Sequence, residues 1–127
     1  MVILDTNIII DYLRRIESGD AYLVKIAEKI GRKELAISVI TIQELFEGKS
    51  TLNKYKEGNV WDTLTPLKIY PYTIEVAQLA GQIIRDFGVL EFADAAIAAT
   101  AMINEGELFT LNQKDFKGIK DLKIYIL

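Results

Sequence analysis

Short apolar runs rich in β-branched residues alternate along this chain with longer segments of helical period. The runs span Val2–Asp5, Leu35–Val39, Leu67–Tyr70, Leu108–Leu111 and Leu122–Ile126. Helices are expected between them, over 7–15, 20–31, 41–46, 52–64, 73–87 and 94–104. Strands that alternate with helices form parallel sheets, because each parallel connection must cross the sheet before the next strand begins. The pattern predicts an α/β fold: a three-layer α/β/α sandwich around a parallel sheet of about five strands.

The length and composition indicate one domain over residues 1–127. Half of the 127 residues are hydrophobic, which is enough to bury roughly two thirds of the unfolded surface. The absence of cysteine excludes disulfides and Cys-based zinc sites, and it fits a reducing compartment. No uninterrupted apolar stretch reaches the ~18 residues of a membrane span. We therefore expect a soluble, cytoplasmic protein with no membrane partner.

The chain also lacks histidine, so the commonest general base is missing along with the thiol nucleophile. Two carboxylates nevertheless stand in very apolar surroundings: Asp5 ends the run Val2–Leu4, and Asp94 opens the run 95–99. An unpaired negative charge in a poorly hydrated place costs several kcal/mol, so donors, a helix terminus or a cation must compensate it. A divalent metal would serve both carboxylates. The net charge of −3 argues against general polyanion binding.

Asp5 follows the first predicted strand, and ligands of an open parallel sheet gather beyond the carboxyl ends of its strands. A metal site and a simple helix cap are equally good interpretations of Asp5 alone. Glu44 stands three residues after Thr41, so spacing alone favours a capping box, although the strand end before it directs Glu44 to the same edge. Asp94 has the same two interpretations, as a helix cap or as part of a site.

The last polar segment follows the fourth predicted strand. Asn112 and Asp115 are both typical of turns, and in isolation that is the better interpretation. At the end of a strand, either residue could complete a carboxylate cluster.

Together these segments resemble the PIN-domain ribonucleases, and specifically the VapC-type toxins of toxin–antitoxin pairs. The likeness spans nearly the whole chain and rests on the order and spacing of its motifs. The motifs are Leu4-Asp5-Thr6-Asn7, Thr41 with Glu44-Leu45 and Gly48, the segment 94–101, and Thr110-Leu111-Asn112-Gln113-Lys114-Asp115-Phe116.

The resemblance implies a metal-dependent endoribonuclease that hydrolyses RNA phosphodiester bonds through metal-activated water. Its three acids map to Asp5, Glu44 and Asp94, and Asp115 becomes the fourth. Asp5 and Asp94 would bind Mg²⁺, or alternatively Mn²⁺, while Glu44 would orient water and Asp115 would act from the outer shell. The supporting polar residues would be Thr6, Asn7, Thr110 and Asn112.

The resemblance also implies a homodimer and a cognate antitoxin protein that blocks the acidic groove. The segment 42–46 and the helix after Leu52 are candidate dimer surfaces. Phosphates of the RNA substrate would need positive charge, and the candidates are Arg14, Arg15, Lys49, Lys54, Lys56, Lys114 and Lys117.

Three other functions compete with this one. The first is a catalytically inactive PIN-like interaction module, in which the acids are caps. The second is a receiver or phosphatase that uses Asp5 as phosphoacceptor, from which Asp5-Thr6-Asn7 departs because the second acid is missing. The third is a structure-specific DNA nuclease, whose extra length this chain lacks.

Overall fold

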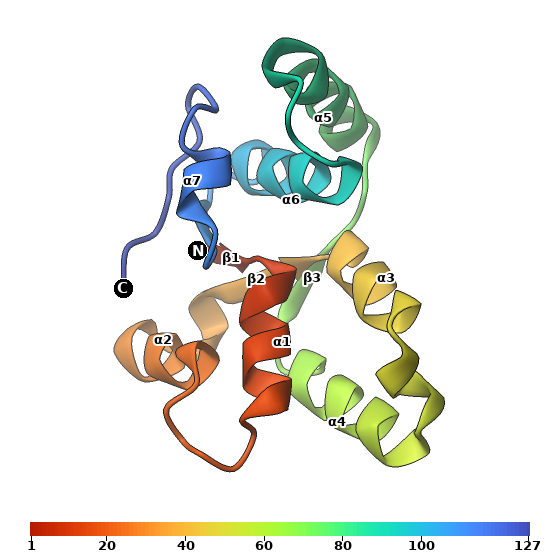
Figure 1. The fold of residues 1–127 in the computed structure, drawn as a ribbon. Helices are drawn as coiled ribbons and strands as arrows, with labels where there is room; N and C mark the ends of the chain where they lie inside the picture. The colour runs from red at the N-terminus through yellow and green to blue at the C-terminus, as the bar shows by residue number, and fades with distance from the viewer.

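The computed structural model describes residues 1–127, and its centre is a four-stranded parallel sheet in the order β3-β2-β1-β4 (Figure 1). The strands are β1 (Val2–Leu4), β2 (Leu35–Ser38), β3 (Lys68–Tyr70) and β4 (Glu107–Phe109). The α-helices are α1 (Thr6–Arg14), α2 (Tyr22–Ile30), α3 (Val39–Glu47), α4 (Lys54–Leu64), α5 (Ile74–Phe87), α6 (Phe92–Ile103) and α7 (Gln113–Phe116). Two short 3-10 helices, η1 (Arg32–Glu34) and η2 (Lys49–Leu52), complete the fold.

Alternation along the strands produces two cores, one on each face of the sheet. In β1, Ile3 packs in a cluster with α5 and α6, whereas Val2 and Leu4 pack in a cluster with α1, α2 and α4. Successive side chains of a strand point to opposite faces, and here both faces are buried. Figure 1 shows α5 and α6 on one side of the sheet and α1, α2 and α4 on the other, which confirms the three-layer sandwich.

The expected fifth strand is the main correction to the fold. Residues 122–126 contribute only an isolated parallel bridge between Leu108 and Ile124. The backbone of Leu108 bonds to Lys123 and Tyr125, at 2.8 Å each. Both bonds are made by one residue of β4, so the C-terminal segment adds a single bridge to the sheet and no fifth strand. The predicted strand 108–111 likewise ends at Phe109, which leaves Thr110 just beyond the strand.

Several helix caps also differ from the expected ones. Asp5, not Asn7, is the N-cap of α1, and its side chain accepts a hydrogen bond from Thr6 N. Ser38, not Thr41, caps α3, and Glu91, not Asp94, precedes α6. In each case the helix starts two or three residues earlier than its pattern suggested. Thr73 caps α5 as expected, accepting from Val76 N at 3.2 Å.

No helix combines the length and the apolar character needed to cross a bilayer.

Candidate functional site

The carboxyl ends of β1 and β4 lie side by side and bring Asp5 next to Thr110. The two strands pair in parallel, with Leu4 opposite Phe109, and Asp5 N donates to the Phe109 carbonyl at 2.9 Å. The next residue of each strand therefore projects from the same edge of the sheet. Two segments more than a hundred residues apart thus meet at this edge.

Asp5 is a buried carboxylate held by two donors. Its Oδ1 accepts from Thr6 N at 2.8 Å, and its Oδ2 accepts from the Thr110 hydroxyl at 2.6 Å. Only 4% of the residue is exposed. Burial raises the pKa of Asp5 above its ordinary value, the two hydrogen bonds oppose that rise, and the charges of Glu44 and Asp115 add to it. The carboxyl group is therefore fixed in position, and its charged form is less favourable than it would be in water.

Glu44 reaches the same edge from the middle of α3. Its Oε1 accepts from the Thr6 hydroxyl at 2.6 Å, and the same hydroxyl lies 3.0 Å from Thr41 Oγ1. The capping-box interpretation of Thr41 and Glu44 is wrong, because Ser38 accepts from Ile40 N and caps the helix. Freed from the cap, the Glu44 side chain points across to α1.

Asp94 lies in the first turn of α6 and is half-buried. Burial, first of all, raises the pKa of Asp94 to about 6, and the charges of Asp5, Glu44, Glu91 and Asp115 contribute further. Acids from separate segments of the chain therefore lie near enough to Asp94 to affect its pKa. Such a perturbed carboxyl group in a cluster of acids is typical of a functional site, although structural ion pairs also perturb pKa values.

Asp115, rather than Asn112, joins the acidic cluster. Asp115 and Asp94 both line a small cleft of about 200 Å³, whose other lining residues are Val89, Leu90 and Glu91. Asn112 is exposed and enters the hydrogen-bond network only through its backbone N–H, which donates to Thr110 Oγ1 at 3.0 Å.

Asn7 joins α1 to the segment after β4. Its Nδ2 donates to Thr110 Oγ1 at 3.3 Å, and its Oδ1 accepts from Leu111 N at 3.3 Å. The four polar residues expected to support the site, Thr6, Asn7, Thr110 and Asn112, therefore lie in one network with Asp5 and Glu44.

The donor chemistry of the edge fits a hard divalent cation. All the candidate ligands are carboxylate, hydroxyl or amide oxygens, which Mg²⁺ and Mn²⁺ prefer. Burial first, and the neighbouring negative charges after it, raise the pKa values of Asp5 and Asp94, and a cation beside them would favour their charged forms. As the side chains stand, however, no three carboxylates are close enough together to hold one ion. An ion held by three of these carboxylates would require some of their side chains to move closer together.

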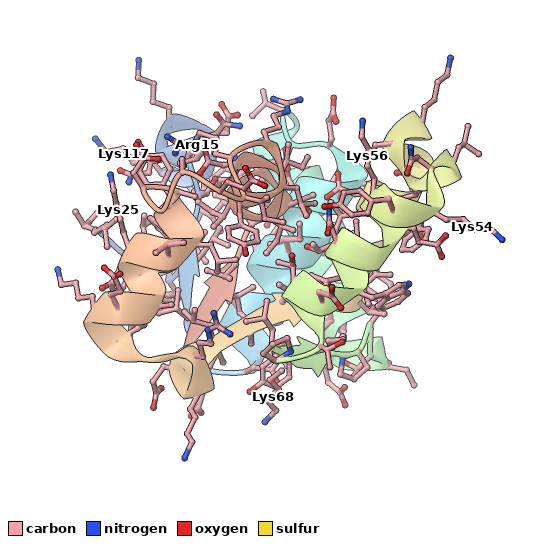
Figure 2. All side chains as sticks on the ribbon, turned by 90° about the horizontal axis from the view of Figure 1, so that it is seen from below. Arg15, Lys25, Lys54, Lys56, Lys68 and Lys117 are labelled. Carbon is pink, nitrogen blue, oxygen red and sulfur yellow. The ribbon has the colours of Figure 1, made fainter.

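The basic side chains do not form one patch. Figure 2 shows Lys54 and Lys56 on one side of the molecule and Lys25 and Lys117 on the opposite side. Arg15 is not free for phosphate, because it pairs with Asp11 at 3.0 Å and with Asp20 at 3.3 Å. The other predicted phosphate contacts stay candidates: Arg14, Lys49, Lys54, Lys56, Lys114 and Lys117.

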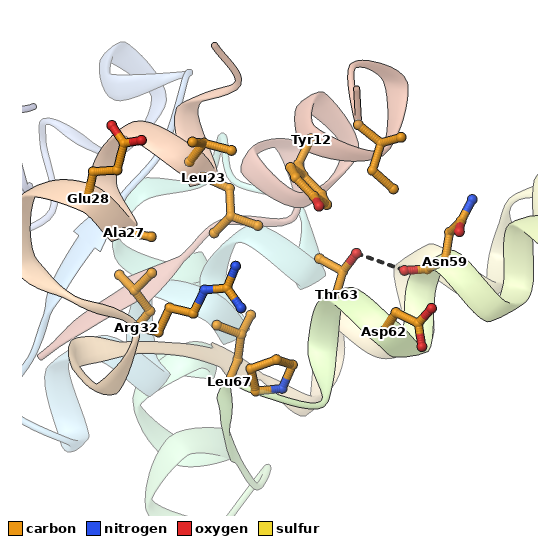
Figure 3. A pocket seen from close by; sticks show the side chains of 13 residues that line it. Tyr12, Leu23, Ala27, Glu28, Arg32, Asn59, Asp62, Thr63 and Leu67 are labelled. Carbon is orange, nitrogen blue, oxygen red and sulfur yellow. Dashed lines mark hydrogen bonds between the residues drawn. The ribbon is translucent and has the colours of Figure 1, made fainter. Parts of the chain in front are cut away.

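Sequence reasoning missed two features. Thr41 was considered as a cap and as part of a motif, but no spacing rule reveals its contact with Thr6, which joins two helices. The second feature is a pocket of about 530 Å³ on the opposite side of the sheet from α5 and α6 (Figure 3). Its lining comes from α1, α2, η1, β2, α4 and the turn before β3, a combination that only the tertiary fold creates.

Comparison with known proteins agrees with this geometry. The PIN-domain family model matches residues 2–122. Ribonuclease VapC10 of Mycobacterium tuberculosis is 32% identical over 127 residues, covering 97% of this chain and 91% of the relative. Ribonuclease VapC1 of Methanocaldococcus jannaschii is 28% identical over 137 residues, covering 98% and 86%. A solved toxin–antitoxin complex from Klebsiella pneumoniae contains a chain with 30% identity, a TM-score of 0.75 and full coverage of both chains. The chain belongs to the PIN-domain family.

Proposed function

We propose that this chain is the endoribonuclease toxin of a VapBC-type toxin–antitoxin pair, and that it hydrolyses RNA in a reaction dependent on Mg²⁺ or Mn²⁺. The observation that carries the proposal is the placement of four acids at one edge of the sheet. Thr6 links Asp5 to Glu44 by hydrogen bonds, and Asp94 and Asp115 line one cleft. The relatives named as ribonucleases supply the substrate class, because the acids alone do not distinguish RNA from DNA.

The residues divide the work by their surroundings. Asp5 and Asp94 carry the raised pKa values, and we assign them as the ligands of the ion. Thr110 and the Thr6 N–H hold the Asp5 carboxylate so that little motion is lost when it binds. When bound, the ion would supply an activated water and would neutralise charge on the phosphoryl oxygens.

Glu44 and Asp115 complete the site. Glu44 accepts from Thr6 with one oxygen, and its second oxygen has no protein donor, so it can accept a proton or orient a water. Asp115 lines the cleft beside Asp94, and we assign it to the outer shell of the ion. Lys114 and Lys117 flank Asp115 in sequence and would offset its charge toward an RNA phosphate.

The cognate antitoxin is the partner, and its block of the acidic groove stays a prediction. We propose that a further segment of the antitoxin occupies the pocket of about 530 Å³. Leu23, Leu35 and Leu67 contribute to its apolar wall. Figure 3 shows the Arg32 guanidinium pointing into the pocket between Leu23 and Leu67, while Glu28 and Asp62 point away from it. Arg32 takes part in none of the four ion pairs of the chain. The pocket therefore fits an apolar segment that carries a carboxylate.

A homodimer stays a prediction of the account. Its candidate surfaces include large apolar side chains that are exposed in the single chain: Phe46, Leu52, Tyr55 and Trp61. Light scattering of the purified protein would measure the oligomeric state.

Cleavage of cellular RNA by the purified protein tests the proposed activity. We expect cleavage with Mg²⁺ or Mn²⁺, none with a chelator, and a loss of at least roughly a hundredfold in Asp5→Asn and Asp94→Asn. Asp86→Asn is the matched control, because this exposed carboxylate pairs with Arg85 on α5, outside the acidic cluster. Activity that persists in both site variants would refute the proposal. A protein that binds antitoxin but cleaves nothing would instead be an interaction module.

A further inference from the structure

Thr41 is a fully buried polar side chain that no cap or acid motif explains. It lies in the first turn of α3, where Ser38 holds the cap. In the interior of α6, the equally buried Thr100 donates to the Ala96 carbonyl at 2.7 Å. Thr41 makes no such bond, and its hydroxyl lies 3.0 Å from Thr6 Oγ1 instead.

Counting protons fixes the direction of this contact. The Thr6 hydroxyl has one proton, and it donates that proton to Glu44 Oε1 at 2.6 Å. In the contact between the two threonines, only Thr41 then has a proton to give. We infer that Thr41 donates to Thr6 and Thr6 donates to Glu44, so that Thr41 is a positioning residue for the Glu44 carboxylate.

The two hydroxyls are buried, so the series of hydrogen bonds from Thr41 through Thr6 to Glu44 is shielded from solvent. Thr41 is 0% exposed and Thr6 is 5% exposed, so solvent has little access to replace a missing donor. Thr6 also holds Asp5 through its backbone N–H, at 2.8 Å. This backbone bond keeps Thr6 in place when the Thr41 hydroxyl is lost, so the loss acts on the Thr6 hydroxyl and, through it, on Glu44. The inference rests on the proposed function for its catalytic consequence, but the orientation of Glu44 can be measured without it.

The kinetic test replaces the hydroxyl by a methyl group of the same shape. Thr41→Val should lower kcat by roughly three- to tenfold, the effect of one net hydrogen bond, with KM unchanged. Thr41→Ser should restore kcat, because it keeps the donor. Thr100→Val is the control, since it removes an equally buried hydroxyl outside the network and should leave kcat unchanged.

A double-mutant cycle separates positioning from general structure. In a Glu44→Ala background, Thr41→Val should cause no further loss of kcat, because the group that it positions is gone. An equal loss in both backgrounds, or no loss in the wild type, would overturn the inference. Thr41→Ala serves in the same cycle if the valine variant does not fold.

A structural measurement keeps this inference distinct from the proposed function. NMR of the Glu44 side chain should show one fixed rotamer in the wild type and rotamer averaging in Thr41→Val. If the wild type cleaves no RNA, the proposed function fails while this prediction still stands to be tested. A Glu44 rotamer that is equally fixed in Thr41→Val would refute the positioning role.

Discussion

The proposed activity depends on individual carboxylates, and the effect of one of them, Asp94, on the free energy of unfolding can be measured. The pKa of Asp94 rises from 3.8 to about 6 through burial and through the neighbouring charges. The folded protein therefore holds this proton more tightly than the unfolded chain does. The protonated Asp94 therefore contributes its full share to the free energy of unfolding below about pH 4, and this contribution is lost as the pH rises through about 6.

We predict that Asp94→Asn removes this dependence. Relative to the variant, the wild type should lose about 1–2 kcal/mol of unfolding free energy between pH 4 and pH 6.5, less than the full shift implies because solvent screens a half-buried group. Urea denaturation of both proteins across this range, without divalent ions, measures the difference. Asp20 and Asp86, whose pKa values are lowered, act in the opposite direction and cancel in the comparison. A difference that does not change with pH would contradict the assigned burial of Asp94.

At the scale of single residues, Asp5 and Asp94 became candidates because their neighbours in sequence are apolar. Glu44 and Asp115 became candidates through the resemblance to the PIN-domain ribonucleases, because in isolation a helix cap and a turn explain them better. The bond from Thr6 to Glu44 could not be found in this way, because its partners lie 38 residues apart. No local pattern encodes such a contact.

Among the elements, the shortest α-helix, α7, carries Asp115. α7 has four residues, and Asp115 is followed there by Phe116, which is 2% exposed and packs in the core cluster with α5 and α6. The aromatic ring fixes the helix, and the helix carries the carboxylate toward Asp94. In α7, the residue that packs in the core therefore follows directly after the site carboxylate.

Phe116→Ala should therefore damage both stability and the site. We expect a loss of about 3–4 kcal/mol in unfolding free energy, because a large buried ring leaves a cavity. Activity at a temperature where the variant stays folded should also fall. Chemical denaturation and RNA cleavage measure the two effects. Leu111→Ala is a useful comparison, because Leu111 is 42% exposed and should cost far less stability. Equal losses in the two variants would contradict the anchoring role of Phe116.

η1 is the second element with a prediction of its own, since it supplies Arg32 to the pocket. Arg32→Glu should weaken binding of the antitoxin at least roughly tenfold and leave RNA cleavage unchanged, because the pocket is separate from the acids. Lys33→Glu makes the same charge change on the next residue, which does not line the pocket. Calorimetric titration with the antitoxin compares the two variants. Equal affinities would show that the antitoxin does not use this pocket.

Helix starts show where sequence rules reach their limit. Asn7, Thr41 and Asp94 each stand at a plausible cap position, yet the helices begin earlier, at Asp5, Ser38 and Glu91. α1 and α3 begin directly after β1 and β2, so the polar residue at the strand end, Asp5 or Ser38, is the cap. α6 follows α5 instead of a strand, and the side chain of Glu91 makes no capping hydrogen bond. Asp5 is therefore both a helix cap and a site acid, whereas Asp94 lies inside its helix.

Taken as a whole, the molecule uses its two faces differently. One core cluster joins the sheet to α5, α6 and α7, and the other joins it to α1, α2 and α4. The acids collect at the carboxyl edge between the two cores, whereas the pocket lies wholly within the second layer. We therefore predict that RNA cleavage and partner binding at the pocket can be changed separately.

The three-layer architecture was predictable, because one or more helices follow each strand before the next strand begins and because both faces of β1 are apolar. The number of strands was not. The segment 122–126 has a strand-like composition, but it pairs with β4 only through the bridge between Leu108 and Ile124. The pocket was also beyond prediction, because its lining gathers residues from 12 to 67 in three dimensions.

We propose that the four acids form a site for a divalent ion. Electron paramagnetic resonance measures this directly, because it detects free Mn²⁺ and therefore the amount of Mn²⁺ that the protein binds. Titration of Mn²⁺ into the wild type should deplete the free-ion signal in proportion to the protein. Asp5→Asn and Asp94→Asn should lose most of that binding, and Asp86→Asn should keep it. A wild type that leaves the Mn²⁺ signal unchanged, or site variants that bind as well as the wild type, would contradict the account.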